Sequence, residues 1–329
     1  MSDLPELRAL RESAVLVDFD AHDVLRATGN DRVSLLHRIT SGKVAGTEPG
    51  QGCQTLLLDV RGHVLASLLV FAQSQSVRIV VPGGQGPSVA GGLAKYAVMD
   101  DFQIAPEPGL TTLAVLGPRA GAALQAVGVP GAQGVLEGSL LAHQESTSER
   151  FGTVWVAHGR RCGMDGLCVA LRADHCRALA SALGQAGTPR LAAEIADALR
   201  IAALEPAPGK EITPERFPVE IGLGAALDHT KGCYLGQETI VRMRDRGIVR
   251  KRLALLRLAG DELPDSGDQV ACEGQPAAGQ VTSAARLPGE PPLALAVLAS
   301  AVPTGAAVRI QHASTELAAE VTADVPPWG

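Results

Sequence analysis

The sequence predicts an α+β protein that ends in a small all-β barrel. Its 329 residues are too many for one ordinary hydrophobic core, so we expect two or three domains. Up to about residue 245, some stretches carry apolar residues at helical spacing and others at strand spacing. From residue 246 onward, short strands alternate with glycine and proline turns, a pattern typical of small barrels. We therefore place a domain boundary near residue 246.

Residues 31–40 illustrate how the individual elements are predicted. Val33, Leu36 and Ile39 recur at a spacing of three, which puts them on one side of a helix. The same reasoning predicts a hairpin over 53–72 that turns at Arg61–Gly62, strands over 76–82, 111–117, 153–158 and 167–172, a helix followed by a strand within 86–107, and helices over 118–128, 173–187 and 191–206.

The helix predicted over 191–206 is a strong one, with Leu191, Ile195 and Leu199 on one side. The barrel strands are expected within four segments of the C-terminal region: 250–260, 268–287, 293–300 and 306–323.

Charge and hydropathy exclude several classes of protein. The net charge of −6 argues against general binding to nucleic acid or to anionic membranes. The longest apolar run near the C-terminus, Leu293 to Val302, is half of the roughly 20 residues that cross a bilayer. The first twelve residues are acidic and lack the apolar core of a signal peptide. Six scattered cysteines without a regular framework favour a reducing compartment, so we expect a cytoplasmic protein.

Two further patterns point to structure rather than to chemistry. Cys162, Cys168 and Cys176 are spaced by six and eight residues, which matches neither a zinc ribbon nor an iron–sulfur run, so we interpret them as core residues and predict no metal site. The segment 117–128 follows a strand and opens a helix, but it lacks the glycine spacing of a dinucleotide-binding loop.

A third pattern carries positive charge. Residues 231–252 contain seven basic and two acidic residues, a net charge of +5 within a protein of −6. Guanidinium groups bind carboxylates and phosphates through two hydrogen bonds, so this stretch suits a polycarboxylate or phosphate ligand. The alternative is a solvated edge beside the barrel.

Cys233 lies at the start of this basic stretch, two residues after Lys231. Neighbouring cations favour the thiolate, which is the nucleophilic and metal-binding form of cysteine. One cysteine cannot hold an iron–sulfur cluster alone, because such clusters need about four thiolates. The residues themselves leave three roles open for it: a transient metal ligand, a redox-sensitive thiol, or a packing residue.

The segment KGCYLGQETIVR, residues 231–242, resembles the K-G-C-Y-x-G-Q-E-x-x-x-R signature of the YgfZ-type folate-binding proteins, which are related to the aminomethyltransferase (T-protein) of the glycine cleavage system. Its eight fixed positions are all present, namely Lys231, Gly232, Cys233, Tyr234, Gly236, Gln237, Glu238 and Arg242. Weaker similarity extends over nearly the whole chain, including 35–71, 161–171, 216–223 and 279–298.

The resemblance implies a three-domain aminomethyltransferase-like fold around a central channel. Residues 1–245 would form the folate-binding region from two intertwined α+β modules, and residues 246–329 the barrel. The ligand would be tetrahydrofolate or a one-carbon folate, possibly polyglutamylated, with its glutamate tail toward basic residues. Cys233 and Lys231 would be the catalytic residues. The folate contacts would come from the rest of the signature and the basic stretch: Tyr234, Gln237, Glu238, Arg242 and Arg244.

The family's link to iron–sulfur enzymes implies client enzymes as partners, including ones that modify tRNA, and no direct contact with nucleic acid or membrane. The chain departs from the T-protein at the acidic pair that follows the hairpin turn, where it has Ala66 and Ser67, and at the helix glutamate that contacts the pterin, where it has Ala202. Because alanine can neither accept a hydrogen bond from the pterin nor act as a general base, these changes argue against glycine-cleavage chemistry.

Three functions follow from the sequence. The first is a folate-binding accessory protein for iron–sulfur enzymes with Cys233 as its reactive thiol. The second is a tetrahydrofolate-dependent aminomethyl or one-carbon transferase or demethylase, which needs a carboxylate at a position that the alignment does not show. The third is a non-catalytic module that binds a partner through the basic stretch.

Overall fold

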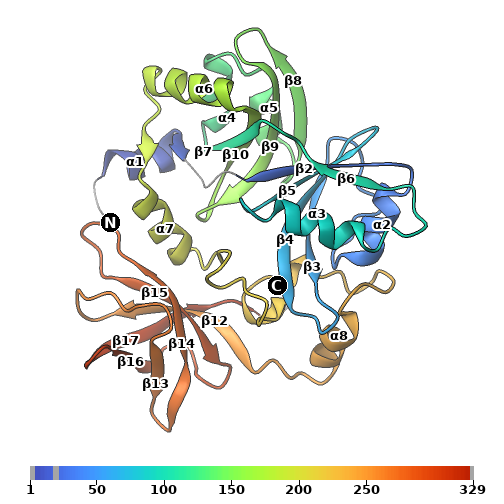
Figure 1. Ribbon diagram of the computed structural model, residues 1–329. Coiled ribbons are helices and arrows are strands. Elements are labelled where there is room, and N and C mark those ends of the chain that lie inside the picture. The colour runs from blue at the N-terminus through green and yellow to red at the C-terminus, as the bar shows by residue number, and fades with distance from the viewer. Residues whose placement is uncertain (1–3, 18–21, 327–329) are drawn as a thin grey trace.

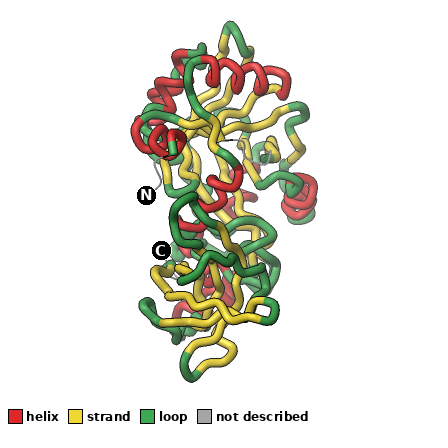
Figure 2. The backbone as a smooth tube through the Cα atoms, turned by 90° about the vertical axis from the view of Figure 1, so that its left-hand side faces the viewer, coloured by secondary structure: helices red, strands yellow, loops and turns green. Residues whose placement is uncertain are grey.

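The computed structural model describes residues 4–17 and 22–326. Two sheets with their helices and a closed barrel make up three units around a common centre (Figure 1). This confirms the predicted α+β class and the C-terminal barrel. In the view turned by 90°, the barrel lies at one end of the molecule and the two sheets at the other (Figure 2).

The five-stranded sheet has the strand order β3-β4-β5-β2-β6. Its elements are β2 (Asp23–Thr28), α2 (Arg32–Ile39), β3 (Gly52–Leu58), β4 (Val64–Ala72), β5 (Val77–Val81), α3 (Gly86–Ala94) and β6 (Gln103–Pro106). The hairpin predicted over 53–72 is present as β3 and β4. Its turn depends on Asp59, whose carboxylate accepts the backbone N–H groups of Arg61 and His63 at 2.8 and 2.9 Å.

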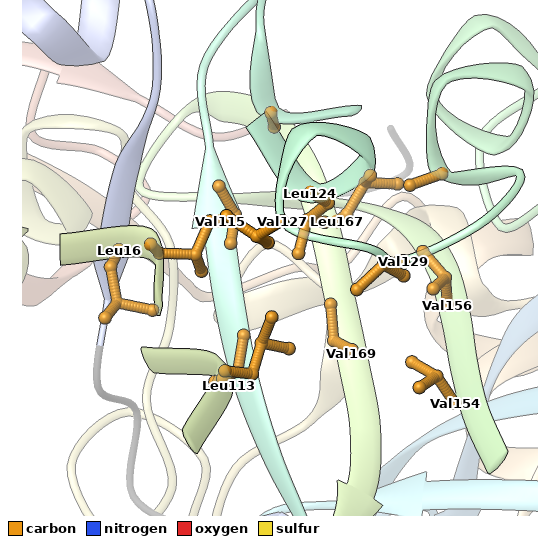
Figure 3. Packing of buried hydrophobic residues seen from close by; sticks show 14 of the residues in the cluster. Leu16, Leu113, Val115, Leu124, Val127, Val129, Val154, Val156, Leu167 and Val169 are labelled. Atoms are coloured by element: carbon orange, nitrogen blue, oxygen red, sulfur yellow. The ribbon is translucent and has the colours of Figure 1, made fainter. Parts of the chain in front are cut away.

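The six-stranded sheet has the order β11-β1-β7-β10-β9-β8. Its elements are α1 (Pro5–Glu12), β1 (Val15–Val17), β7 (Leu110–Leu116), α4 (Ala120–Ala126), α5 (Ala132–Glu137), β8 (His143–Ser148), β9 (Gly152–Arg161), β10 (Met164–Arg172), α6 (Ala173–Gln185) and β11 (Arg190–Leu191). The chain thus contributes β1, leaves to build the whole five-stranded sheet, and then returns. Figure 3 shows part of the aliphatic core of this sheet and its helices, a cluster to which Leu16, Val115, Leu124 and Val169 belong.

Helix α7 (Ala193–Ala202) leads from the six-stranded sheet toward the barrel (Figure 1). The prediction that Leu191 belongs to this helix was wrong, because Leu191 lies in β11 and pairs with Val17. Sequence periodicity could not assign Leu191 to the strand rather than to the helix, because a buried apolar residue fits either element. Beyond α7 the chain is mostly irregular, with only the short helical turns η1 (Pro218–Glu220) and η2 (Gly224–Ala226) before α8 (Gln237–Asp245).

The barrel closes through six antiparallel strands in the order β12-β15-β14-β13-β16-β17. They are β12 (Lys251–Leu258), β13 (Gln269–Cys272), β14 (Gln275–Ala285), β15 (Leu293–Ala299), β16 (Ala307–His312) and β17 (Thr315–Asp324). Closure leaves no exposed sheet edge. Arg200 of α7 ties the barrel to the rest of the chain, because it pairs with buried Glu211 at 3.2 Å and donates to Ser283 of β14 at 3.1 Å. None of the helices in the described ranges has the length and apolar character needed to cross a membrane.

Candidate functional site

A cavity of about 640 Å³ lies where the units meet. The five-stranded sheet supplies Gln54, Ser67 and Phe71, and the six-stranded sheet supplies Thr112 and Trp155. The rest of the wall includes residues that follow α7 and β17: Ala203, Leu204, Glu205, Pro206 and Val325. The site is therefore assembled from segments far apart in the sequence.

Aromatic side chains form one wall of this cavity. Trp155 and Phe71 come from different sheets and meet edge to face, with ring centroids 4.8 Å apart. The indole N–H of Trp155 donates to Nδ1 of His143 at 3.1 Å, and the Arg78 guanidinium lies 5.3 Å from the indole centroid. These contacts hold the indole in place, and both rings are only 2% exposed, so they line the cavity with little free surface.

A charged group forms another part of the wall. The Arg161 guanidinium lies 3.4 Å from the Glu205 carboxylate and donates to Nε2 of His22 at 2.5 Å. Glu205 also accepts the backbone N–H of Cys162 at 2.7 Å. Burial, together with the neighbouring Arg161 charge, lowers the pKa of His22 to about 3, so this imidazole is neutral at physiological pH.

The three positions that align with T-protein carboxylates differ in their surroundings. Ala66 is buried in the core of the five-stranded sheet, where a carboxylate would be costly. Ser67 lines the cavity, and its hydroxyl accepts a hydrogen bond from Gln54 at 3.2 Å. Ala202 is the last residue of α7 and is exposed, whereas its neighbour Ala203 lines the cavity. The wall therefore has no carboxylate at any of the three aligned positions.

The signature segment (residues 231–242) is a separate feature. It begins in a loop after η2 and continues into α8, beside the tip of the β3–β4 hairpin (Figure 1). Asp228 shapes the start of the loop by accepting the backbone N–H groups of Thr230 and Lys231 at 2.7 and 3.1 Å. The hydrogen bonds from Thr230 also lower the pKa of this carboxyl group.

Lys231 joins this loop to the end of α2. Its ammonium group donates to the backbone carbonyls of His37, Thr40 and Gly42, and the last two contacts measure 2.5 and 2.9 Å. An ammonium has three N–H donors, so these carbonyls use all of them. Burial lowers the pKa of Lys231 to about 8. The geometry gives this residue a structural role.

Cys233 and Tyr234 differ sharply in exposure. Cys233 is exposed and is a free thiol. Tyr234 is 7 % exposed, and burial raises its pKa to about 12. Its hydroxyl finds no hydrogen-bond partner in the parts of the chain that the structure describes, and the Lys231 ammonium lies 5.4 Å from its ring centroid. The thiol is therefore the group of the loop that faces solvent.

The rest of the signature segment organises α8. Gly236 has φ +78° immediately before the helix, and a Cβ atom there would lie 2.5 Å from the carbonyl oxygen of Asp59 in the hairpin turn. The Gln237 side chain accepts the N–H of Tyr234 at 3.3 Å. Glu238 and Arg242 form an exposed ion pair at 2.6 Å, and Arg244 pairs with Asp245 at 3.1 Å.

None of the seven predicted site residues is among those that line the cavity. In the structure Tyr234 contacts both Lys231 and Gln237, and Cys233, Glu238 and Arg242 lie on the surface of the same segment. Sequence reasoning missed the cavity residues, namely His22, Gln54, Phe71, Trp155, Arg161 and Glu205. They share no motif, and Trp155, one of two tryptophans in the chain, was the one readable signal.

The three cysteines considered from the sequence are free thiols. Cys162 is buried, and Cys168 and Cys176 are half-buried in β10 and α6. Burial raises the pKa of Cys162 to about 12 and that of Cys168 to about 11, which keeps both as thiols. No group of three or more His, Cys, Asp or Glu side chains within residues 4–17 and 22–326 could hold a metal ion.

Known proteins share this architecture. The glycine cleavage system aminomethyltransferase T from Bartonella henselae superposes with a TM-score of 0.85 over 99% of this chain and 89% of its own, at 22% sequence identity, which shows the fold alone. The aminomethyltransferase of Bacillus subtilis is 24% identical over 291 residues, 86% of this chain and 78% of its own.

A chloroplastic protein of Arabidopsis thaliana that is named as a transferase is 25% identical over 267 residues, 80% of this chain, and the match spans 61% of that relative's length. The family model described as the GCVT N-terminal domain matches residues 3–231, which is more than half of the chain. The chain therefore belongs to the GCVT N-terminal domain family.

Proposed function

We propose that this chain is a YgfZ-type folate-binding accessory protein that supports the assembly or repair of iron–sulfur clusters in client enzymes, including enzymes that modify tRNA. The observation that carries the proposal is the exposed thiol of Cys233 within a complete signature segment. The absence of a carboxylate at Ala66, Ser67 and Ala202 supports an accessory role over aminomethyl transfer.

The cavity fits a folate in size and chemistry. Its volume of about 640 Å³ lies in the range of roughly 300–1,000 Å³ that is usual for small-molecule sites. Trp155 and Phe71 would contact a planar ring, and Gln54, Ser67 and Glu205 would offer hydrogen bonds to its edges. Tetrahydrofolate, when bound, supplies a carrier for one-carbon units.

The thiol and the cavity would serve different steps. Lys231 and Gly236 fix the loop against α2 and the hairpin turn, so Cys233 is presented on an ordered scaffold. Because the thiol is exposed, a protein client can reach it without opening the fold. A thiolate is the form that binds metal or attacks sulfur, and the basic residues of α8 lie on the same segment.

The test is a Cys233→Ala variant in cells that depend on this protein for iron–sulfur enzyme activity. We expect the variant to fold normally and to lose its support of those enzymes. Cys272→Ala, in β13 of the barrel, is the matched control and should keep full support. Full support by Cys233→Ala would show that the thiol role is wrong.

Folate binding is tested separately by calorimetric titration of the wild-type protein with tetrahydrofolate polyglutamate. We expect saturable binding of one ligand per chain. If no heat of binding is detected at any ligand concentration used, neither the accessory function nor the transferase function can depend on folate.

A second candidate function is a tetrahydrofolate-dependent one-carbon transferase or demethylase. The relatives named as aminomethyltransferases and the Glu205 carboxylate in the cavity wall favour it. Incubation of the protein with tetrahydrofolate and an aminomethyl donor, whose carbon is already at the methylene oxidation level and which releases ammonia on transfer, should yield no methylene-folate under the accessory proposal. Catalytic formation of methylene-folate would favour the transferase instead.

The third candidate, a partner-binding module, is favoured by the exposed cations after α8. Arg246 caps the C-terminus of α8, and both Arg246 and Arg250 are exposed. Charge reversal at Arg244 and Arg246 that abolishes capture of an iron–sulfur client, while folate affinity stays unchanged, would support this module. Unchanged capture would contradict it.

A further inference from the structure

Two residues near the end of α7 have backbone conformations that non-glycine residues rarely adopt. Leu204 has φ +54° and Cys162 has φ +53°. Leu204 ends α7 in a Schellman motif: its own N–H donates to Ile201, and the N–H of Glu205 donates to Arg200, both at 3.0 Å. Glycine is the usual residue at such a position, and retained strain of this kind clusters at functional sites.

Both residues with these unusual conformations are neighbours of Glu205, one in the sequence and one through a hydrogen bond. The turn at Leu204 brings Glu205 into the cavity wall directly after the helix, and the backbone N–H of Cys162 donates to its Oε2 atom at 2.7 Å. The Arg161 guanidinium lies 3.4 Å from Oε1. A carboxylate has about four acceptor positions, so these two contacts leave acceptor capacity on a side chain that is 25% exposed.

Glu205 is also the one acidic residue among the described residues that line the cavity. The alignment places the T-protein's pterin-contacting glutamate at Ala202, three residues earlier and on the exposed end of α7. The other charged lining residues are Arg160, which pairs with Asp165, and Arg161. The neutral imidazole of His22 brings no charge, so Glu205 supplies the negative charge of this wall.

We propose that Glu205 is the specificity-determining residue of the cavity, and that its carboxylate accepts hydrogen bonds from the 2-amino-pyrimidinone edge of the bound ring. This inference rests on the proposed folate function and adds the group that discriminates between ligands. Arg161 and the Cys162 N–H position the carboxylate. A ring that lacks the 2-amino group leaves the Glu205 carboxylate with one ligand hydrogen bond fewer.

The experiment compares two ligands by calorimetry: tetrahydrofolate and its analogue with methyl in place of the 2-amino group. We expect the wild-type protein to bind tetrahydrofolate at least about tenfold more tightly, because the analogue keeps the ring N3–H but lacks the amino donor, so one hydrogen bond to Glu205 is lost. In Glu205→Gln, which keeps an acceptor for the Cys162 N–H, the preference should fall below about threefold, while analogue affinity stays within about twofold of wild type.

Glu215→Gln is the matched control, since Glu215 is exposed and does not line the cavity. It should keep the wild-type preference. Equal weakening of both ligands in Glu205→Gln assigns the residue a purely structural role and overturns the proposal. A wild-type protein that binds both ligands equally overturns it without any variant. Binding of neither ligand overturns the proposed folate function itself, and this inference falls with it.

Discussion

The signature segment and the cavity wall differ in what their residues do. In the signature segment, Lys231, Tyr234 and Gly236 are committed to packing the loop against α2 and the hairpin turn, and Cys233 is left exposed. In the cavity wall, Glu205 and Trp155 line the same cavity, and neither belongs to a sequence motif. A strong sequence motif can therefore describe a scaffold around one exposed side chain.

The exposed Cys233 thiol and the cavity are thus two separate features of the molecule. The following predictions test that division, from the largest expected effect to the smallest.

The largest effect is expected for Lys231→Met. Methionine keeps the apolar stem but cannot donate to the carbonyls of His37, Thr40 and Gly42. Leaving buried carbonyls without partners costs about 1–3 kcal/mol each, so we expect the free energy of unfolding to fall by about 4 kcal/mol in urea titrations. Exposed Lys251→Met should change it by less than about 0.5 kcal/mol. A similarly small change for Lys231→Met would contradict the scaffold role.

Gly236→Ala should destabilise the fold by about 3 kcal/mol. The new Cβ would lie 2.5 Å from the Asp59 carbonyl oxygen, in a backbone conformation with φ +78°. Gly232→Ala in the same segment is the control, because no atom lies within 4 Å of its Cβ position. Equal thermal unfolding temperatures for the two variants would show that the turn adapts freely.

His22 makes the cavity wall sensitive to acid. Its folded-state pKa is about 3, below the ordinary value of 6.5, so between these values the unfolded chain binds more protons than the folded chain. Stability therefore rises with pH through this window, by up to about 1.4 kcal/mol per pH unit from this group. We expect His22→Asn to remove that slope in urea titrations at pH 4, 5 and 6, measured against wild type.

His312 provides a control of opposite sign. Its hydrogen bond with Asp268 raises its pKa, so its stabilisation is fully present below the unfolded value and is lost as pH rises through the folded one. His312→Asn should therefore change the slope of the free energy of unfolding against pH near neutral pH rather than at acid pH. A change of slope of the same sign in both variants would contradict the assignment for His22.

Arg244→Ala tests whether the signature segment contacts the ligand at all. The sequence predicts that this residue receives a folate tail, and a single exposed ion pair is worth up to about 1 kcal/mol. We expect polyglutamylated tetrahydrofolate to bind about threefold more weakly while the monoglutamate is unaffected. If calorimetry gives the variant the same affinity as the wild-type protein for each of the two ligands, the folate contacts are confined to the cavity wall.

The smallest effect on folding is expected for Cys233→Ser. The side chain is exposed, so the free energy of unfolding should change by less than about 0.5 kcal/mol. Tetrahydrofolate affinity should also stay within twofold, although support of iron–sulfur enzymes is lost. A large loss of folate affinity would join the two regions into a single site.

Much of the fold was predictable because its signals are local. Apolar strand-length runs identified the β3–β4 hairpin, and Arg61–Gly62 marked its turn. Strand-length runs separated by glycine and proline identified the barrel. Leu191 was placed in the wrong element because its burial comes from pairing with β1, which lies far away in the sequence.

The sequence by itself determined the fold class and the barrel and marked the signature segment, since periodicity, turn residues and a dense motif are properties of neighbouring residues. Only the tertiary structure decided what surrounds the cavity. Whether Glu205 faces that space depends on the turn at Leu204, on the Cys162 N–H and on Arg161, which lies 44 positions away. Such placement is set by packing between distant segments, and no local pattern encodes it.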